Sequence, residues 1–253
     1  MTEDEKLPFT SHLEELRRRL IICFSAIGVC FVICYVFSKK LFEILMQPLI
    51  SAMPPDGKLI YTGLPEAFFT YLKVALLAGI LLSVPILMYQ LWMFIAPGLY
   101  SKEKRWVLPI VCLSSFFFMG GALFGYFIVF PFGFKFFMGF ASDYIRALPS
   151  MREYLGFSAK LLFAFGVVFE MPLFITFLAK LGIVDVKFLR TKRRYAILLF
   201  FVFSAILTPP DVITQIMMAG PLILLYEVSI LGAKMFGKKA AKEDISESQE
   251  SAG

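Results

Sequence analysis

The sequence has few charged residues, one histidine and four cysteines, and each scarcity excludes a class of protein. Charged side chains make up 17% of the 253 residues, which is too few to cover the surface of a water-soluble domain. With His12 as its one histidine, the chain lacks the second histidine of an intramembrane zinc protease. The cysteines lie inside apolar runs without CxxC spacing, which argues against a disulfide framework or a metal site.

The residue patterns typical of nucleotide binding, nucleophilic catalysis and nucleic-acid binding are absent from the sequence as well. The sequence has no glycine-rich loop to hold a nucleotide phosphate, and no general base is paired with a nucleophile in an apolar run. The 25 Lys and Arg residues form no stripe with interleaved aromatic residues, so the net charge of +6 does not indicate nucleic-acid binding. We therefore expect a protein that is not an enzyme, needs no cofactor and binds no nucleic acid.

Hydrophobic residues are abundant: they make up 59% of the chain, which includes 30 Phe and has a mean hydropathy of +0.78. A helix needs about 20 mostly apolar residues to cross about 30 Å of hydrocarbon. Because backbone polar groups in lipid must be bonded within the segment, runs of this kind form helices. Six runs qualify or nearly qualify: Ile21–Phe37, Phe68–Phe94, Val107–Pro131, Phe157–Ala179, Tyr195–Thr208 and Val212–Phe236.

The Lys and Arg residues between these runs predict their orientation. Most of them lie in the terminal segments and in the connections after the second and fourth runs, and positive residues concentrate on the cytoplasmic side of a membrane. We therefore predict an all-α, polytopic membrane protein with six transmembrane helices and both termini in the cytoplasm. Its parts are an amphipathic N-terminal helix (1–20), a transmembrane domain (21–236) and a disordered tail (237–253).

Proline and run length predict a curved bundle. Pro85, Pro172 and Pro221 lie inside the second, fourth and sixth runs, where proline kinks a helix. The fifth run, Tyr195–Thr208, corresponds to about 21 Å of helix, and three residues separate it from the sixth. A hairpin this short favours local thinning of the bilayer or oligomerisation, or it simply packs behind longer helices.

Two acidic residues on the expected cytoplasmic side are weak candidates by themselves. In the N-terminal helix, Glu15 shares one flank with His12 and Arg19, whereas Arg17 lies on the other flank. This spacing favours an i,i+4 ion pair between Glu15 and Arg19. Glu103 follows the second run at the start of a helix, where the helix dipole stabilises a carboxylate. From the residues alone, we interpret both as structural.

Glu170 is a sharper candidate because it lies near the middle of the fourth run. A carboxylate at that depth marks a hydrated cavity, a proton relay or a polar partner. The candidate partners are Gln90, Tyr126 and Gln215. Glu227 lies nearer the cytoplasmic end of the sixth run, and we interpret it as a solvated interfacial carboxylate.

Several strings, taken together in their order and spacing, resemble the TatC family, the multispanning subunit of the twin-arginine protein translocase. The resemblance runs from about Phe9 to Phe236 and agrees with six spans. The strings are His12 to Arg17, Pro48-Leu49, Phe94 to Leu99 followed by Glu103, Phe130-Pro131, Phe165 to Pro172, and Leu207 to Asp211 with Gln215.

The resemblance implies a receptor for twin-arginine signal peptides. It works with TatA- and TatB-type single-span partners, in an oligomer, to move folded proteins across the bacterial cytoplasmic (inner) membrane on the proton motive force. The residues that match Glu15 and Glu103 then contact the arginine pair, and Arg17 and Phe94 share their surface.

The resemblance also assigns the remaining candidates. Glu170 faces a concave surface that takes the apolar part of the signal peptide, and Pro48, Asp211 and Gln215 belong to the outer-side cap and the shallow hairpin. Two alternatives stay open at this stage. A proton-coupled small-solute transporter using Glu170 would be expected to show inverted repeats, and none is apparent. A structural scaffold would need no exposed carboxylates on its cytoplasmic face.

Overall fold

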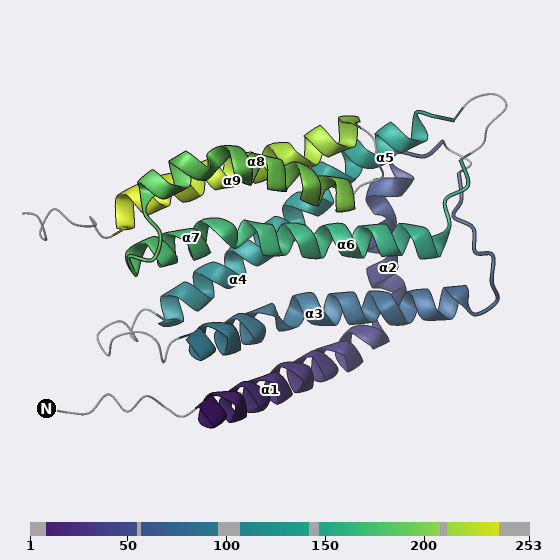
Figure 1. Ribbon diagram of the computed structural model, residues 1–253. Helices are drawn as coiled ribbons and strands as arrows, with labels where there is room; N and C mark the ends of the chain where they lie inside the picture. Colours follow the sequence, from purple (N-terminus) through teal and green to yellow (C-terminus); the bar gives the residue numbers. More distant parts are fainter. Residues whose placement is uncertain (1–8, 55–56, 96–106, 142–146, 208–211, 238–253) are drawn as a thin grey trace, which may run out of the picture. The chain divides into compact units, whose positions relative to one another are not determined.

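The computed structural model describes residues 9–54, 57–95, 107–141, 147–207 and 212–237 (Figure 1). Within these ranges the prediction of an all-α chain is confirmed, apart from one isolated β-bridge between Ile60 and Ser150. The helices are α1 (Phe9–Val36), α2 (Ser38–Ile50), α3 (Glu66–Ile95), α4 (Val107–Phe124), the π-helical segment η3 (Gly125–Val129), α5 (Phe130–Met138), α6 (Met151–Phe169), α7 (Met171–Lys180), α8 (Val186–Leu207) and α9 (Val212–Phe236).

Five helical stretches among the described residues are long and apolar enough to cross a membrane: His12–Val36, Glu66–Ile95, Leu108–Met138, Met151–Lys180 and Val212–Phe236. The predicted fifth crossing is not among them. It lies in α8, which begins at Val186, nine residues before the predicted run. The basic residues Lys192–Arg194 are therefore part of the same helix. The crossing at Tyr195–Thr208, and with it the count of six spans, stays a prediction, as does the orientation.

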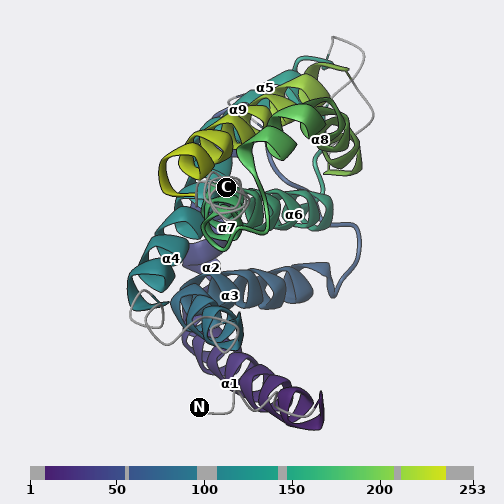
Figure 2. The same cartoon turned by 60° about the vertical axis from the view of Figure 1, so that its left-hand side comes forward.

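The chain divides into two compact units, Met1–Gly166 and Val167–Gly253. In the first unit, α1 lies alongside α3, as Figures 1 and 2 both show. The close approach depends on Gly79: a Cβ there would lie 2.8 Å from the backbone nitrogen of Phe31. The rest of α1 is largely exposed, with Phe24 and Val36 at 69% and 75%. Such apolar exposure is expected of a helix that faces lipid rather than water.

Helix α2 lies outside the six predicted apolar runs, between the first and the second. Its buried residues, among them Phe42, Leu45 and Leu49, recur every three or four positions, and this spacing places them on one face of a helix. Two tyrosine hydroxyls donate hydrogen bonds to carbonyl oxygens of α2: Tyr126 to Ile44 at 2.5 Å, and Tyr154 to Leu45. These bonds hold α2 against helices that follow it by some 80 residues or more.

The third predicted run is longer than expected and continues to Met138. Pro131 does not end it, because Pro131 lies in the first turn of α5, where a missing N–H costs no hydrogen bond. The π-helical segment Gly125–Val129 joins α4 to α5. An aromatic cluster follows, in which Phe134 contacts both Phe130 and Tyr154, with ring centroids 5.3 Å apart in each case.

The fourth predicted run is interrupted at Glu170, between α6 and α7. The cause is Pro172, which lacks an N–H and therefore cannot bond to the carbonyl four residues earlier. The Glu170 amide instead donates to the carbonyl of Val167 at 3.1 Å, one residue closer than in an α-helix. Helices α3 and α9, in contrast, continue through Pro85 and Pro221.

In the second unit, α9 packs against both α7 and α8. Small residues allow these contacts: Gly232 of α9 lies directly against Thr176 of α7. A hydrogen bond also links α8 to α9: the Tyr226 hydroxyl donates to the Leu189 carbonyl at 2.9 Å. Such interhelical hydrogen bonds are typical of helix packing in membranes, where the hydrophobic effect does not drive association.

Candidate functional site

The antiparallel packing of α1 and α3 brings residues 12–19 next to residues 90–94. The ring of His12 stacks on that of Phe94, with centroids 4.4 Å apart and planes 19° from parallel. The two residues come from different helices. They can stack because the first turns of α1 lie beside the last turns of α3 (Figure 1). His12 Nδ1 also lies 4.0 Å from a carboxylate oxygen of Glu15.

Glu15 is the centre of this cluster. One of its oxygens, Oε1, accepts from both Nε (2.9 Å) and a terminal nitrogen of the Arg19 guanidinium. The other terminal nitrogen of Arg19 donates to Oε1 of Gln90 in α3 at 3.1 Å. The chain Glu15–Arg19–Gln90 therefore confirms the predicted i,i+4 pair and extends it to a second helix.

A cavity of about 580 Å³ opens beside this cluster. Its lining combines charged and apolar side chains: Glu14, Glu15, Arg18, Arg19, Ile22, Tyr89, Gln90 and Met93. The side chain of Glu15 is 25% exposed and that of Arg19 is 17% exposed. Both ions are thus partly removed from water, which strengthens the attraction between them, yet they remain within reach of a ligand.

The structure brings together some of the predicted site residues and separates others. Glu15 and Phe94 are joined through His12. Arg17 lies on the opposite flank of α1, as predicted, and lines an adjoining cavity that shares Glu14 and Arg18 with the first. Glu103 and Asp211 lie outside the described residues. Pro48 is buried in the last turns of α2.

Glu170 lies at the α6–α7 junction, whereas its three candidate partners bond elsewhere. Gln90 accepts from Arg19, and the Tyr126 hydroxyl donates to the Ile44 carbonyl. Gln215 Nε2 donates to the Phe201 carbonyl at 3.0 Å, which links α9 to α8. Glu227 is not merely solvated, because one of its oxygens lies 2.6 Å from the Arg193 guanidinium.

Comparisons with known proteins agree with this architecture. A family model described as the Sec-independent protein translocase protein (TatC) matches residues 11–221. The chain belongs to the TatC family. It is 62% identical to the TatC protein of Desulforapulum autotrophicum over 96% of this chain and 90% of the relative, and 49% identical to that of Magnetococcus marinus over the same shares.

A solved structure supports the fold of the TatC family for this chain. The crystal structure of the twin-arginine translocase receptor TatC matches with a TM-score of 0.79 and 42% sequence identity, over 88% of this chain and 98% of that one. The predicted family and polytopic fold are thus confirmed. As a TatC protein, the chain is a membrane-embedded component of a protein translocase rather than an enzyme.

Proposed function

We propose that the chain is the receptor for twin-arginine signal peptides and that Glu15 binds one guanidinium group of the arginine pair. One observation carries the proposal: a guanidinium group, that of Arg19, already occupies the Glu15 carboxylate. The site therefore has the geometry to bind an arginine side chain, in a cavity large enough to admit a second one.

The contacts of Arg19 explain a preference for arginine. Its guanidinium presents a planar fork of donors, two of which converge on Glu15 while a third reaches Gln90. A lysine ammonium is a compact, strongly hydrated charge without such a fork. A lysine pair is therefore expected to make fewer charge-assisted bonds at this site and to bind more weakly.

Binding then proceeds as an exchange. An incoming arginine displaces Arg19 from Glu15, and Arg19 retains its 3.1 Å bond to Gln90. One guanidinium replaces another at the carboxylate, so Glu15 is never left without a cationic partner. This matters because leaving a buried charge without its partner costs several kcal/mol.

The second arginine of the peptide is assigned to Glu103, with Arg17 and Phe94 on the same cytoplasmic surface. The Phe94 ring, fixed against His12, holds the end of α3 beside Glu15.

The apolar part of the peptide follows a concave face that includes Glu170, while Pro48, Asp211 and Gln215 support the outer side. TatA- and TatB-type partners complete an oligomeric translocase in the bacterial inner membrane, with both termini cytoplasmic and the proton motive force as energy source.

The test is binding of a signal peptide to the chain in native membranes, measured by photocrosslinking from a probe next to Glu15. An arginine-pair peptide is compared with its lysine-pair counterpart. Hydrogen bonds to charged groups contribute about 1.5–3 kcal/mol, so Glu15→Gln is expected to weaken binding of the arginine peptide about 10- to 100-fold.

The matched control is Glu43→Gln. Glu43 is also a helical glutamate paired with a cation, Lys40 at 3.2 Å, but it lies in α2, away from the cluster. It should leave binding unchanged. Equal crosslinking of both peptides, or normal binding to a correctly inserted Glu15→Gln variant, would contradict the proposal.

A further inference from the structure

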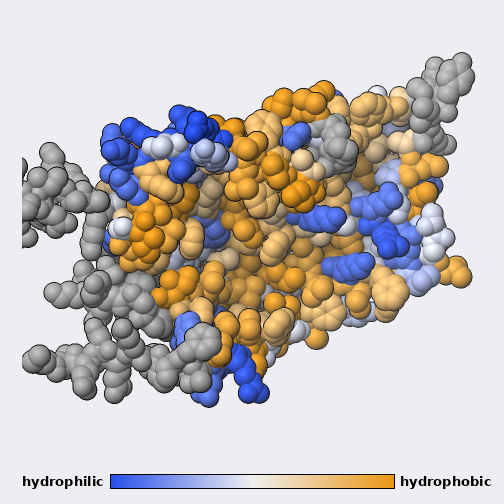
Figure 3. Space-filling model, in the orientation of Figure 1, coloured by the Kyte–Doolittle hydropathy of each residue, from blue (hydrophilic) through white to orange (hydrophobic). Residues whose placement is uncertain are grey.

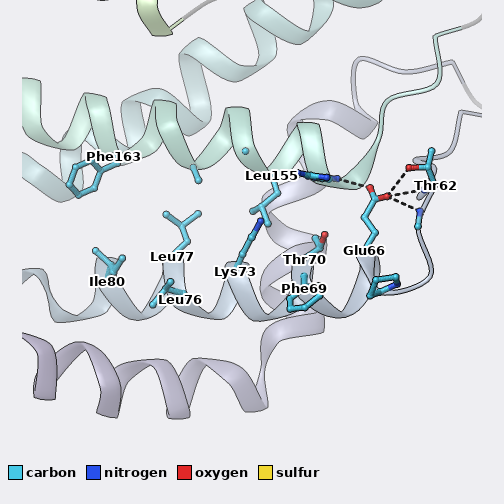
Figure 4. A pocket seen from close by; sticks show the side chains of 15 residues that line it. Thr62, Glu66, Phe69, Thr70, Lys73, Leu76, Leu77, Ile80, Leu155 and Phe163 are labelled. Carbon is cyan, nitrogen blue, oxygen red and sulfur yellow. Dashed lines mark hydrogen bonds between the residues drawn. The ribbon is translucent and has the colours of Figure 1, made fainter.

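A second cavity, of about 670 Å³, lies between α3 and α6 within the first unit (Figure 4). The part of its wall nearer the middle of both helices is apolar and includes Leu76, Leu77, Ile80, Leu155 and Phe163. On the face drawn in Figure 3, hydrophobic side chains cover the middle of α3 and α6, and hydrophilic ones gather towards their Glu66 and Met151 ends. The cavity therefore has one apolar end and one polar end.

Three charged residues line the polar end: Glu66, Lys73 and Arg152. The carboxylate of Glu66 is fully engaged. One oxygen accepts from the Thr62 amide (2.8 Å), the Thr62 hydroxyl and the Gly63 amide, and the other accepts from the Ser150 hydroxyl (2.8 Å) and the Arg152 amide. Glu66 is thus the carboxylate that holds the two loops together, rather than a partner for the cations.

Lys73 and Arg152 make no ion pair within the part of the chain that the structure describes. Lys73 lies seven residues after Glu66, about 10 Å along the helix, and Figure 4 shows its side chain extending from α3 towards α6. A lysine at this depth in an apolar span is costly unless it reaches an anion or the interface. The two cations are therefore placed to bind an anion at the rim of an apolar cavity.

We propose that this cavity binds an anionic phospholipid from the leaflet at the Glu66 end of α3. The headgroup phosphate lies between the Lys73 ammonium and the Arg152 guanidinium, and one acyl chain extends past Leu77 and Ile80 towards Phe163. The cations lie nearer the membrane surface, where the lipid headgroup lies, and the apolar wall lies deeper, where the acyl chain lies.

Volume and charge both suit an anionic lipid. The volume lies within the range of about 300–1,000 Å³ that is usual for small-ligand sites. The cationic rim also disfavours a positively charged peptide. The site is independent of the Glu15 cluster, so neither proposal depends on the other.

The test is native mass spectrometry of the purified full-length chain in mild detergent, with equal amounts of phosphatidylglycerol or phosphatidylcholine. We expect the anionic lipid to be retained preferentially. A cation near the membrane surface contributes about 1 kcal/mol to anionic-lipid binding. Lys73→Ala or Arg152→Ala should therefore weaken binding about fivefold each, and the double variant about 30-fold. Lys135→Ala is the control, because Lys135 lies in α5 and does not line the cavity.

A second variant tests the acyl-chain part with both cations intact. Gly156 lines the cavity, and a Cβ added there meets nothing within 4 Å. Gly156→Leu fills this space and raises helix propensity, so the chain should fold but retain less lipid. Equal retention of the two lipids, no effect of the double variant, or full competition by inorganic phosphate alone would each overturn the proposal.

Discussion

The contact between α1 and α3 at Gly79 makes the most direct prediction, because the candidate site depends on it. A Cβ at residue 79 would lie 2.8 and 2.9 Å from the nitrogen and Cα of Phe31, and 3.2 Å from the carbonyl carbon of Cys30. All three are backbone atoms, so no side-chain rotation relieves the clash. To restore ordinary contact at 3.4 Å, α1 must move away from α3 by about 0.6 Å.

The expected cost of Gly79→Ala is the cost of overpacking, about 1–3 kcal/mol of folding free energy. The matched control is Gly28→Ala. Gly28 lies in α1, and a Cβ there meets nothing within 4 Å. Alanine also has a higher helix propensity than glycine, by up to about 1 kcal/mol. Both substitutions share this gain, so Gly79→Ala should be the less stable of the two by the overpacking cost, about 1–3 kcal/mol.

Thermal unfolding of both variants in detergent, followed by circular dichroism, measures this difference. Binding of the arginine-pair peptide provides a second readout, because separating the helices loosens the His12–Phe94 stack and the Arg19–Gln90 bond. If Gly79→Ala is as stable as Gly28→Ala and binds the peptide normally, the helices are not locked together at this glycine and the reasoning is wrong.

Two further predictions concern single hydrogen-bonded side chains. Arg19→Gln frees Glu15 from its internal guanidinium, so the arginine-pair peptide should bind about fivefold more tightly in a direct binding assay, corresponding to about 1 kcal/mol. Weaker binding would show that Arg19 belongs to the site rather than competing for it. Tyr226→Phe removes the buried 2.9 Å bond to the Leu189 carbonyl and should lower the stability of the α8–α9 pair by about 1 kcal/mol; an unchanged unfolding temperature would contradict this.

The features that were predicted correctly from the sequence depend on residues close together in the chain. A membrane-spanning helix needs an apolar run of fixed length, so hydropathy located five of the six runs in helices that can cross a membrane. The interruption at Glu170 follows from Pro172, and the Glu15–Arg19 pair follows from four-residue spacing. Each of these features is determined by residues a few positions apart.

The features that were missed depend on contacts between distant segments. Gln90 was considered only as a partner for Glu170, and nothing in α3 indicates that Arg19, 71 residues earlier, would reach it. Lys73 was not predicted as a site residue, because its cavity exists only once α6 lies opposite α3. Helix α2 did carry a signal, the spacing of Phe42, Leu45 and Leu49, but it is too short and polar for a search based on long apolar runs.

The β-bridge between Ile60 and Ser150 has a consequence for how the two loops tolerate change. The Ile60 amide donates to the Pro149 carbonyl at 3.1 Å, and the Ile60 carbonyl accepts from the Met151 amide at 2.9 Å. These bonds use main-chain atoms, so they do not depend on which side chain residue 60 carries. A reporter group attached at residue 60 should be accepted, whereas inserting one residue before Glu66 would move its carboxylate away from Ser150. In these loops, length is constrained more tightly than composition.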